Sequence, residues 1–328
     1  MEKITREIGV YNEWGKLREA MVGIVPDNMV EPDYMQAFAW MGAKGEEYCR
    51  KYGGQKSIEV FPEEMRILKE QVEGHVKVLE SYGVKVHRNQ IFKYPEEEHF
   101  LDGTQRGLVI SGGADFFRVI GKNVILLDAL RYPFRRKQIY TVRPVLEPLL
   151  EGTDTRYVAL PPPSPHYCED DIFLENGDLM IDGHNVYVGK SGLATNDRGI
   201  AWLKQFLGPE YKLHVIKLAS NVLHLDTVLT LNRKGLLTYY PDLVSELPDT
   251  LKKWDKIEVC MLEGETMAFG ANHLSLDQKN IIVSKEYERV AEEFAKKGMN
   301  PIVIPLGISM AYGSGARCLT GVLSRDSE

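Results

Sequence analysis

Long apolar runs, an excess of positive charge and a targeting segment are all missing from this sequence. No run approaches the roughly 18–20 apolar residues that a membrane-spanning helix requires. The first ten residues, MEKITREIGV, lack the apolar core of a signal peptide, and the early glutamates are atypical of a mitochondrial presequence. A net charge of −7 argues against a phosphate-backbone binder, and we interpret the short basic stretch Arg131–Lys137 as a helix face or loop. We therefore expect a cytoplasmic protein that binds neither membranes nor nucleic acids.

Cysteine is also scarce, with four residues scattered through the 328. They form no C-x-x-C pair and have no histidine at zinc-ligand spacing, so a structural zinc site is not expected. Four isolated thiols in a cytoplasmic chain predict reduced cysteines and no disulfide framework. The sequence has no G-x-G-x-x-G after a predicted strand and no G-x-x-x-x-G-K-[ST], so no motif indicates a nucleotide.

What the sequence does contain is a repeated unit, in a globular composition of 44% hydrophobic and 27% charged residues. Each unit has a β-rich run after a polar turn, an amphipathic helix and a second β-rich run. The first runs of four units are Lys122–Leu127, His184–Gly189, Lys234–Tyr240 and Lys279–Ser284. Their helices are expected at Arg135–Leu150, Asn196–Leu207, Leu243–Trp254 and Lys285–Lys297. Their second runs are Arg156–Leu160, Leu213–Leu218, Ile257–Leu262 and Pro301–Leu306.

The N-terminal part fits the same scheme with an insertion. Leu17–Gly23 is predicted as a strand, Glu63–Tyr82 as a helix and Val84–Arg88 as a second strand. Such units must pack on one another to bury their apolar faces, and an odd number of five predicts a closed ring about a central axis. We expect an α/β fold that forms one domain over residues 1–328, with a loop insertion at about 24–62. This loop either covers the central site or packs on the surface, and its large apolar side chains include Tyr34, Phe38, Trp40 and Met41.

A turn with a reactive residue lies upstream of the first run of each unit. These residues are Asp115, Glu175, His224, Asn272 and, from the C-terminal end of the chain, Cys318. Equivalent turns of a ring project toward the same axis. We therefore expect the acids, the histidine and the cysteine to converge on one central site.

Each of these residues also has a structural interpretation. Asp115 follows two glycines and is suited to capping a turn, and Glu175 adjoins an Asn-Gly hairpin signal. A lone His224 in an apolar run is more often a core histidine, and Cys318 serves equally as a small buried apolar residue. However, Asp226 shares a predicted strand face with His224, and such a pair is costly to bury unless it is paired or used. The glycine-rich approach to the cysteine, GSGAR, indicates a backbone that comes close to another group.

One reaction type uses a cysteine, a histidine and several carboxylates together. A guanidinium is planar, cationic and rich in N–H donors, so flanking carboxylates bind it through bidentate hydrogen bonds and present its central carbon to a thiolate. Asp115 and Asp226 are the candidate clamp. Cys318 is the candidate nucleophile, and the bound cation lowers its pKa. His224 is the candidate general acid and base, with Glu175 orienting and stabilising its imidazolium.

Several motifs surround these residues in a recognisable order. They are YNEW at 11–14 followed by LREAMVG, the Asp115 turn with VIGKNVIL and FRRKQIYTVRPVLEPLL, PPPSP at 161–165, His224-Leu225-Asp226-Thr227, and GSGARCLT around Cys318. Outside the insertion, nearly the whole chain resembles the amidinotransferase / arginine deiminase (pentein) superfamily. The opening motif and the Asp115 segment are most similar to glycine and inosamine amidinotransferases.

The resemblance implies a fivefold pseudo-symmetric α/β propeller built from five strand–helix–strand repeats around the site. It also implies an amidino–thioether intermediate on Cys318, and neither a metal nor an organic cofactor. The roles that it implies for the two aspartates, the glutamate, the histidine and the cysteine match those suggested by the chemistry. We accordingly predict Cys318, His224 and Glu175 as catalytic, and Asp115, Asp226, Asn272 and Arg317 as substrate-binding.

Two positions depart from the pattern of glycine amidinotransferases. Those enzymes have Asp where this chain has Glu175, whose LENGD context is closer to the Glu-Gly-Gly-Asp of deiminases. They also carry an Arg directly after a Pro-Asp pair, where it binds the α-carboxylate of the substrate. In this chain Leu243 stands at that place. Either another cation, such as Arg317 or Arg131, replaces that Arg, or the donor lacks the carboxylate.

Three functions fit these observations. The first is an amidinotransferase that moves the amidino group of L-arginine, or of a related guanidine, to a primary amine. The second is a hydrolase of the deiminase or dihydrolase type, in which water resolves the intermediate. The third is a non-catalytic protein that binds a guanidino metabolite. The acceptor (glycine, lysine, an inosamine or another amine) and a homodimeric state are left open.

Overall fold

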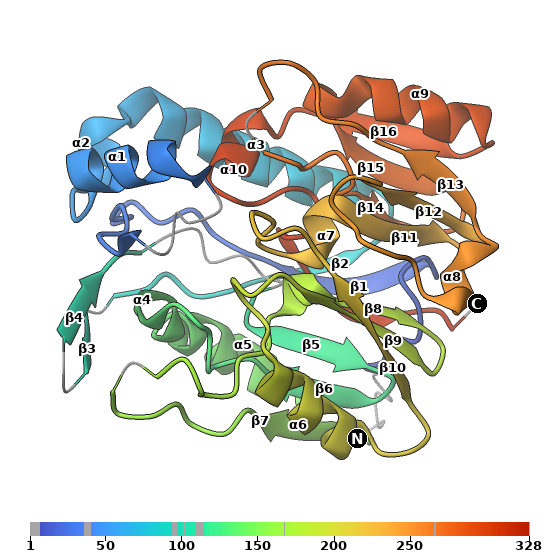
Figure 1. The fold of residues 1–328 in the computed structure, drawn as a ribbon, viewed down its shortest axis with the longest axis horizontal. Helices are drawn as coiled ribbons and strands as arrows, with labels where there is room; N and C mark the ends of the chain where they lie inside the picture. Colours follow the sequence, from blue (N-terminus) through green and yellow to red (C-terminus); the bar gives the residue numbers. More distant parts are fainter. Residues whose placement is uncertain are drawn as a thin grey trace.

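The computed structural model describes residues 7–35, 41–93, 97–100, 103–108, 115–166, 168–265 and 267–327. Within these residues, five three-stranded sheets surround a central axis (Figure 1). A separate hairpin of β3 (Glu97–Phe100) and β4 (Gly103–Arg106) lies at the edge of the molecule. The arrangement is the fivefold pseudo-symmetric α/β propeller that the sequence predicts. No helix in the described ranges is long and apolar enough to cross a membrane.

The five sheets share one plan, in which the middle strand pairs antiparallel with one neighbour and parallel with the other. The antiparallel strands are β17 (Thr320–Arg325), β5 (Phe117–Ile120), β8 (Leu179–Asp182), β11 (Leu229–Arg233) and β14 (Leu274–Ser275). The middle strands, in the same order, are β1 (Leu17–Val22), β6 (Asn123–Leu126), β9 (Asn185–Lys190), β12 (Leu236–Tyr239) and β15 (Asn280–Ser284). The parallel strands are β2 (Lys85–Arg88), β7 (Arg156–Ala159), β10 (Lys212–Lys217), β13 (Asp255–Glu258) and β16 (Asn300–Ile304).

The middle and parallel strands agree with the predicted runs, except that β13 overlaps the run predicted over Ile257–Leu262 only at Ile257 and Glu258. The antiparallel strands were not predicted. They are short and follow directly on the turns that carry the reactive residues, so their pattern is hard to separate from the turn. A signal for four of them exists in the sequence, because a short turn joins each of β5, β8, β11 and β14 to the middle strand that follows it. Gly121 and Gly183 occupy such turns with φ of +57°, a conformation that favours glycine.

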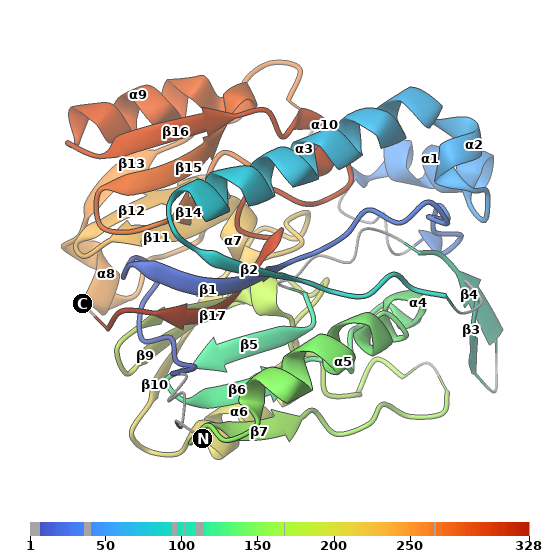
Figure 2. The same ribbon diagram turned by 180° about the vertical axis from the view of Figure 1, so that it is seen from behind.

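The ring is closed by the two ends of the chain. Strand β17 pairs antiparallel with β1, with Leu17 opposite Arg325 and Val22 opposite Thr320 (Figure 2). The last strand thus completes the first sheet. This closure brings the turn that precedes β17 into line with the corresponding turns of the other four sheets.

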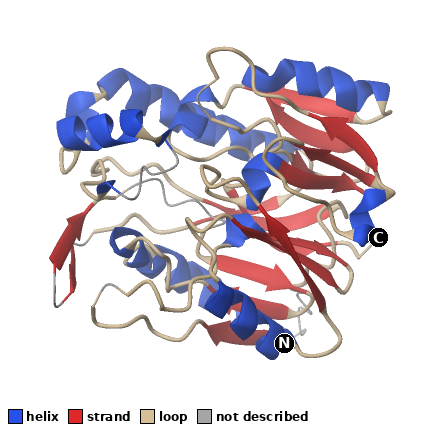
Figure 3. Cartoon of the chain, in the orientation of Figure 1, coloured by secondary structure: helices blue, strands red, loops and turns tan. Residues whose placement is uncertain are grey.

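Helices cover the outside of the ring (Figure 3). The long ones are α3 (Pro62–Ser81), α5 (Ile139–Leu150), α6 (Asp197–Leu207) and α9 (Glu288–Lys296). The continuous helix predicted from Arg135 is wrong, because the chain forms α4 (Pro133–Arg136), turns, and then begins α5. The helix predicted over Leu243–Trp254 is reduced to α8 (Asp249–Lys252). Pro248 explains the late start, since a proline disfavours helical backbone at the residue before it.

The apolar core lies between the sheets and these helices. In β6, Val124, Ile125 and Leu126 are all buried, because this strand is covered on both faces and therefore reads as a continuous apolar run. Helix α9 buries Val290 and Phe294 on its inner face. Each such side chain contributes roughly 1.5–3 kcal/mol when it is fully buried.

The insertion contains helices, so its prediction as a loop is wrong. It forms α1 (Ala43–Tyr52) and α2 (Ser57–Val60), and the Tyr48 hydroxyl donates to buried Glu31 at 2.9 Å. Ahead of α1, the Tyr34 ring meets the Tyr132 ring edge-on, with centroids 6.1 Å apart. Phe38 and Trp40 lie outside the described residues. That this segment covers the site stays a prediction.

Candidate active site

The turns singled out by the sequence lie directly before the antiparallel strands of the five sheets. Asp115, Asn272 and Cys318 each lie two residues ahead of such a strand, at β5, β14 and β17. Glu175 and His224 each precede a single helical turn that leads into β8 and β11. The structure brings these side chains together: hydrogen bonds connect Glu175 with His224 and Asn272 with Cys318, and the charge of Asp115 acts on the Cys318 thiol.

The predicted strand with His224 and Asp226 on one face is wrong. The chain instead forms α7 (Leu225–Val228), one helical turn with His224 as its extended N-cap residue. Asp178 explains the turn, since its Oδ1 accepts the N–H of Leu225 at 3.0 Å and satisfies the start of α7. Both side chains still reach the site, with His224 against the Glu175 carboxylate and Asp226 against the Cys318 thiol.

His224 and Glu175 form a buried pair, with His224 Nε2 and Glu175 Oε2 2.8 Å apart. Burial alone would lower the pKa of the imidazole, but the hydrogen bond and negative charge of Glu175 raise the pKa of His224 to about 9. Burial would likewise raise the pKa of the carboxyl, and His224 and Arg135 overcome this and lower the pKa of Glu175 to about 2. The pair is therefore an imidazolium and a carboxylate at neutral pH.

Gly177 makes room for this pair. A Cβ atom at this position would lie 2.6 Å from Cγ of His224, so a larger residue would displace the imidazole. Glu175 is held in turn from two sides, because its N–H donates to Thr195 Oγ1 at 3.1 Å and its Oε1 accepts the N–H of Arg131 at 3.2 Å. The ENGD segment thus fixes the position of the histidine.

Cys318 is buried, and its Sγ lies between an amide and a carboxylate. Asn272 Nδ2 donates to Sγ at 3.1 Å, and the thiol donates to Asp226 Oδ2 at 3.3 Å. Burial raises the pKa of Cys318 well above its ordinary value, and the charges of Asp226 and Asp115 raise it further. A cation placed among these carboxylates would lower the pKa again and favour the thiolate.

Asn272 also shapes the loop that carries the cysteine. Its Oδ1 accepts the N–H groups of Arg317 at 3.0 Å and of Cys318 at 3.4 Å. A Cβ atom at Gly315 would lie 2.5 Å from this oxygen, which explains why the loop needs glycine there. Asn272, predicted to bind substrate, therefore positions the thiol through both its amide and its carbonyl oxygen.

Asp226 has one engaged and one unsatisfied carboxylate oxygen. Its Oδ2 accepts from Arg317 Nη1 at 2.9 Å and from Cys318 Sγ at 3.3 Å. Its Oδ1 is buried and has no hydrogen-bond partner among the described residues. A buried carboxylate oxygen without a donor is costly, and it marks a place where a ligand N–H would bind.

Asp115 lies next to Arg135, which belongs to the basic stretch predicted as a helix face or loop. Arg135, on α4, contacts Asp115 Oδ2 through Nη2 at 2.7 Å and Glu175 Oε2 through Nη1 at 3.5 Å. Burial raises the pKa of Asp115, and the positive charge of Arg135 opposes this shift. Arg135 is an unpredicted member of the site, because an arginine in a basic stretch looks the same whether it points outward or inward.

A second ion-pair network lies on the other side of Asp226. The guanidinium of Arg317 contacts Asp226, Glu13 Oε2 at 3.3 Å and the carbonyl oxygen of Leu179 at 2.7 Å. Burial would raise the pKa of Glu13, but three arginines, led by Arg118, lower it to about 2. Because Glu13 and the Leu179 carbonyl hold the Arg317 guanidinium on its other side, it is suited to hold Asp226 in place. Glu13, within the YNEW motif, was not recognised as part of this network.

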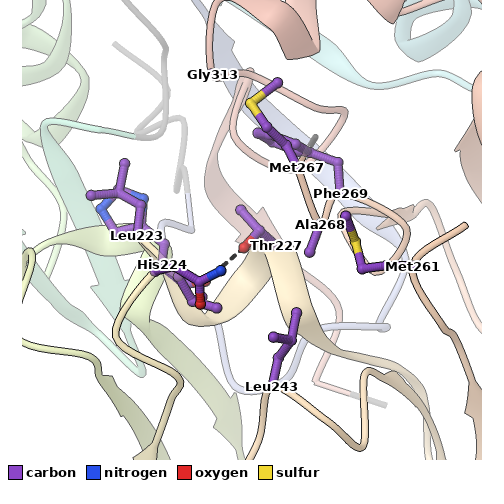
Figure 4. A pocket seen from close by; sticks show the side chains of 11 residues that line it. Leu223, His224, Thr227, Leu243, Met261, Met267, Ala268, Phe269 and Gly313 are labelled. Carbon is purple, nitrogen blue, oxygen red and sulfur yellow. Dashed lines mark hydrogen bonds between the residues drawn. The ribbon is translucent and has the colours of Figure 1, made fainter. Parts of the chain in front are cut away.

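A pocket of about 90 Å³ opens beside His224 (Figure 4). Apart from His224, Thr227 and Asn221, its lining is apolar, and it includes Leu243, the residue that departs from the expected arginine. Among the described residues, no group of three or more His, Cys, Asp or Glu side chains is arranged to hold a metal ion.

No family model matches the chain. The L-arginine:L-lysine amidinotransferase of Pseudomonas savastanoi pv. phaseolicola is 22% identical over 349 aligned residues, which cover 96% of this chain and 94% of that protein. An amidinotransferase from the saxitoxin biosynthetic pathway of Microseira wollei superposes with a TM-score of 0.84 at 23% identity, covering 97% of each chain. The inosamine-phosphate amidinotransferase of Streptomyces griseus superposes with a TM-score of 0.83 at 20% identity, again covering 97% of each chain.

Proposed function

Because this chain is a transferase of the amidinotransferase / arginine deiminase (pentein) superfamily, we propose that it moves an amidino group from a guanidine donor to a primary amine through a covalent adduct on Cys318. L-Arginine is the donor with which other guanidines are compared in the tests below. The observation that carries the proposal is the Asp226 carboxylate. Its Oδ1 has no hydrogen-bond partner among the described residues, and its Oδ2 accepts a hydrogen bond from the Cys318 thiol. A guanidinium bound there has its central carbon next to the nucleophile.

In the first half-reaction the donor guanidinium donates to Asp226 Oδ1, and its positive charge favours the thiolate of Cys318. The thiol proton passes to Asp226 Oδ2, 3.3 Å away, or to solvent. Sγ attacks the central carbon and forms a C–S bond. The C–N bond to the substituted nitrogen then breaks, and the His224 imidazolium protonates this nitrogen as it leaves. The amidino group stays on Cys318 and an amine departs.

In the second half-reaction the acceptor amine takes the place of the departed amine. Neutral His224 removes a proton as the amine nitrogen attacks the amidino carbon, the C–S bond breaks, and Cys318 is regenerated. Glu175 stabilises the imidazolium in both directions, in the role that a third residue has in catalytic triads. Asp115 reaches the donor only if Arg135, now 2.7 Å from it, gives up this ion pair.

The proposal is tested by incubating the protein with L-arginine, or with another guanidine donor, alone and then with a panel of primary amines. We expect the donor's amine (ornithine from arginine) and a new guanidine to appear together, in the presence of an amine only, as measured by mass spectrometry. Citrulline, or ornithine with ammonia, formed without an amine would instead identify a hydrolase. Unconsumed donor with a measurable binding isotherm would identify a binding protein.

A cysteine comparison tests the nucleophile. Cys318→Ala should abolish turnover and leave the circular dichroism spectrum unchanged, since the side chain is small and its loop is held by Asn272. Cys260→Ala is the matched control, because Cys260 is exposed and is not among the residues that line the pocket beside His224. Loss of folding in Cys318→Ala would make the cysteine a core residue, and retained turnover would remove it from the reaction.

A further inference from the structure

The pocket beside His224 has no part in the reaction as described so far, although His224 itself forms part of its wall. Val222, Leu243, Met261, Met267, Ala268 and Phe269 form most of its wall. Met261, Ala268 and Phe269 group on one side, and Leu243 approaches from another (Figure 4). Met261 is 39% exposed, so the apolar surface continues to the mouth of the pocket.

We propose that this pocket holds the hydrocarbon chain of both substrates, so that the enzyme takes an alkylguanidine donor and an alkylamine acceptor whose chains end without a charged group. The inference rests on the proposed function and names the substrate class of the same site. It makes Leu243 a specificity-determining residue.

The reaction itself explains why one pocket serves both substrates. The nitrogen that leaves the donor receives its proton from His224, and the nitrogen that attacks in the second half-reaction gives its proton to the same imidazole. Both nitrogens therefore occupy the same place beside His224. The carbon chains attached to them extend in the same direction, and His224 is part of the pocket wall.

The charges around the pocket exclude an ionised end group. No Lys or Arg is among the described residues that line it. The arginines of the site already have partners within the chain, since Arg131 pairs with Glu169, Arg135 with Asp115, and Arg317 with Asp226 and Glu13. An α-carboxylate placed against Leu243 would lose its hydration without gaining a cation, which disfavours its binding there. A methylene chain in the same place has no hydrogen bonds to water to lose, and its removal from water is favourable.

The size of the pocket limits the length and shape of the chain. Its space of about 90 Å³ is smaller than the cavity of about 150 Å³ that holds a benzene ring in an engineered apolar site. A short, unbranched aliphatic chain fits this space.

The experiment compares n-butylguanidine with L-arginine as donors, using n-pentylamine as acceptor, and measures kcat/KM by mass spectrometry. We expect the wild-type enzyme to prefer n-butylguanidine by about tenfold or more, as is typical when a site lacks the partner of a polar substrate group. Leu243→Arg should shift the preference toward L-arginine by about tenfold or more, because it supplies the missing cation.

Two control variants distinguish the effect of a positive charge at position 243 from the effect of changing that side chain and from the effect of adding a charge elsewhere. Leu243→Met keeps an apolar wall and should keep the preference for n-butylguanidine. Val303→Arg adds the same charge at an exposed position on β16 and should also keep it. A wild-type preference for L-arginine, unchanged by Leu243→Arg, would overturn the inference while leaving the transferase proposal intact.

Binding measurements keep the inference testable if no turnover is seen. Absence of turnover with both donors, and with any acceptor, would remove the proposed function. Calorimetry on Cys318→Ala would then still compare the two guanidines. Tighter binding of n-butylguanidine supports the apolar pocket as a chain site, and equal or tighter binding of L-arginine overturns it.

Discussion

The protonation states of single residues decide how this site would start a reaction. Cys318 is held as a thiol by burial and by Asp226, and His224 is held as an imidazolium by Glu175. An acid for the leaving amine is thus in place before the donor binds, whereas the nucleophile is not. Formation of the thiolate then depends on the positive charge of the substrate, which protects the cysteine from unrelated electrophiles.

The His224–Glu175 pair predicts a pH-dependent stability. Because the pKa of His224 is raised from its ordinary 6.5 to about 9, the stabilisation is fully present below pH 6.5 and is lost as the pH rises through about 9. We expect the free energy of unfolding of the wild type to fall by about 1–3 kcal/mol over this range relative to that of Glu175→Gln. Urea denaturation of both proteins measures it, and parallel pH profiles would contradict it.

The same pair predicts the alkaline limit of activity. The first half-reaction needs the imidazolium, so kcat/KM at low donor concentration should fall as the pH rises above about 9. Glu175→Gln should move this fall to lower pH, because the stabilising charge is gone. An unchanged alkaline limb in the variant would show that another group supplies the proton.

At the scale of elements, short turns rather than helices or long strands hold the reactive groups. The η2 turn (Asn176–Asp178) carries Gly177 against the imidazole and Asp178 against the start of α7. The two turns support each other, because Asp178 Oδ1 in η2 accepts the N–H of Leu225 at the start of α7. The positions of His224 and Glu175 are therefore determined by the packing of two adjacent propeller units.

A glycine comparison tests this dependence. In Gly177→Ala the new methyl would lie 2.6 Å from Cγ of His224, so the ring must shift, and we expect kcat to fall about 10²-fold. Gly74→Ala is the control, because Gly74 lies in α3 with nothing within 4 Å of its new Cβ. The control should keep its activity and gain about 0.5–1 kcal/mol of stability. Equal activities of the two variants would argue against a fixed imidazole.

At the scale of the whole molecule, the two ends of the chain share one sheet. Leu323 of β17 is fully buried, and Arg325 Nη1 donates to the carbonyl oxygen of Gly15 at 2.7 Å. The position of Cys318, just ahead of β17, therefore depends on the pairing of β17 with the N-terminal strand β1. Damage to the closure should destabilise the whole ring.

Leu323→Ala tests the closure. We expect it to lower the free energy of unfolding by about 2–5 kcal/mol, the range for truncating a buried leucine, without changing the urea m-value. Val303→Ala, exposed on β16, should cost less than about 0.5 kcal/mol. A cost below about 1 kcal/mol for Leu323→Ala would show that β17 contributes little to the stability of the ring.

The sequence by itself determined the repeated units, their number and the reactive residue in each turn. It could do so because buried middle strands need continuous apolar runs and amphipathic helices need a regular apolar face, and both patterns are local. The start of the helix predicted from Asn196 is local for the same reason: the Asn196 side chain accepts the N–H of Gly199, three residues away.

Only the tertiary structure decided which charges meet. Arg135 lies in a basic stretch that is predicted as a helix face or loop, yet it contacts both Asp115 of its own unit and Glu175 of the next unit. Likewise, Leu243 lines the pocket beside His224 because the predicted helix there does not form. Such contacts join residues far apart in the chain. The free energies that fix them, from desolvation and ion pairing, depend on the complete ring and leave no periodic pattern in the sequence.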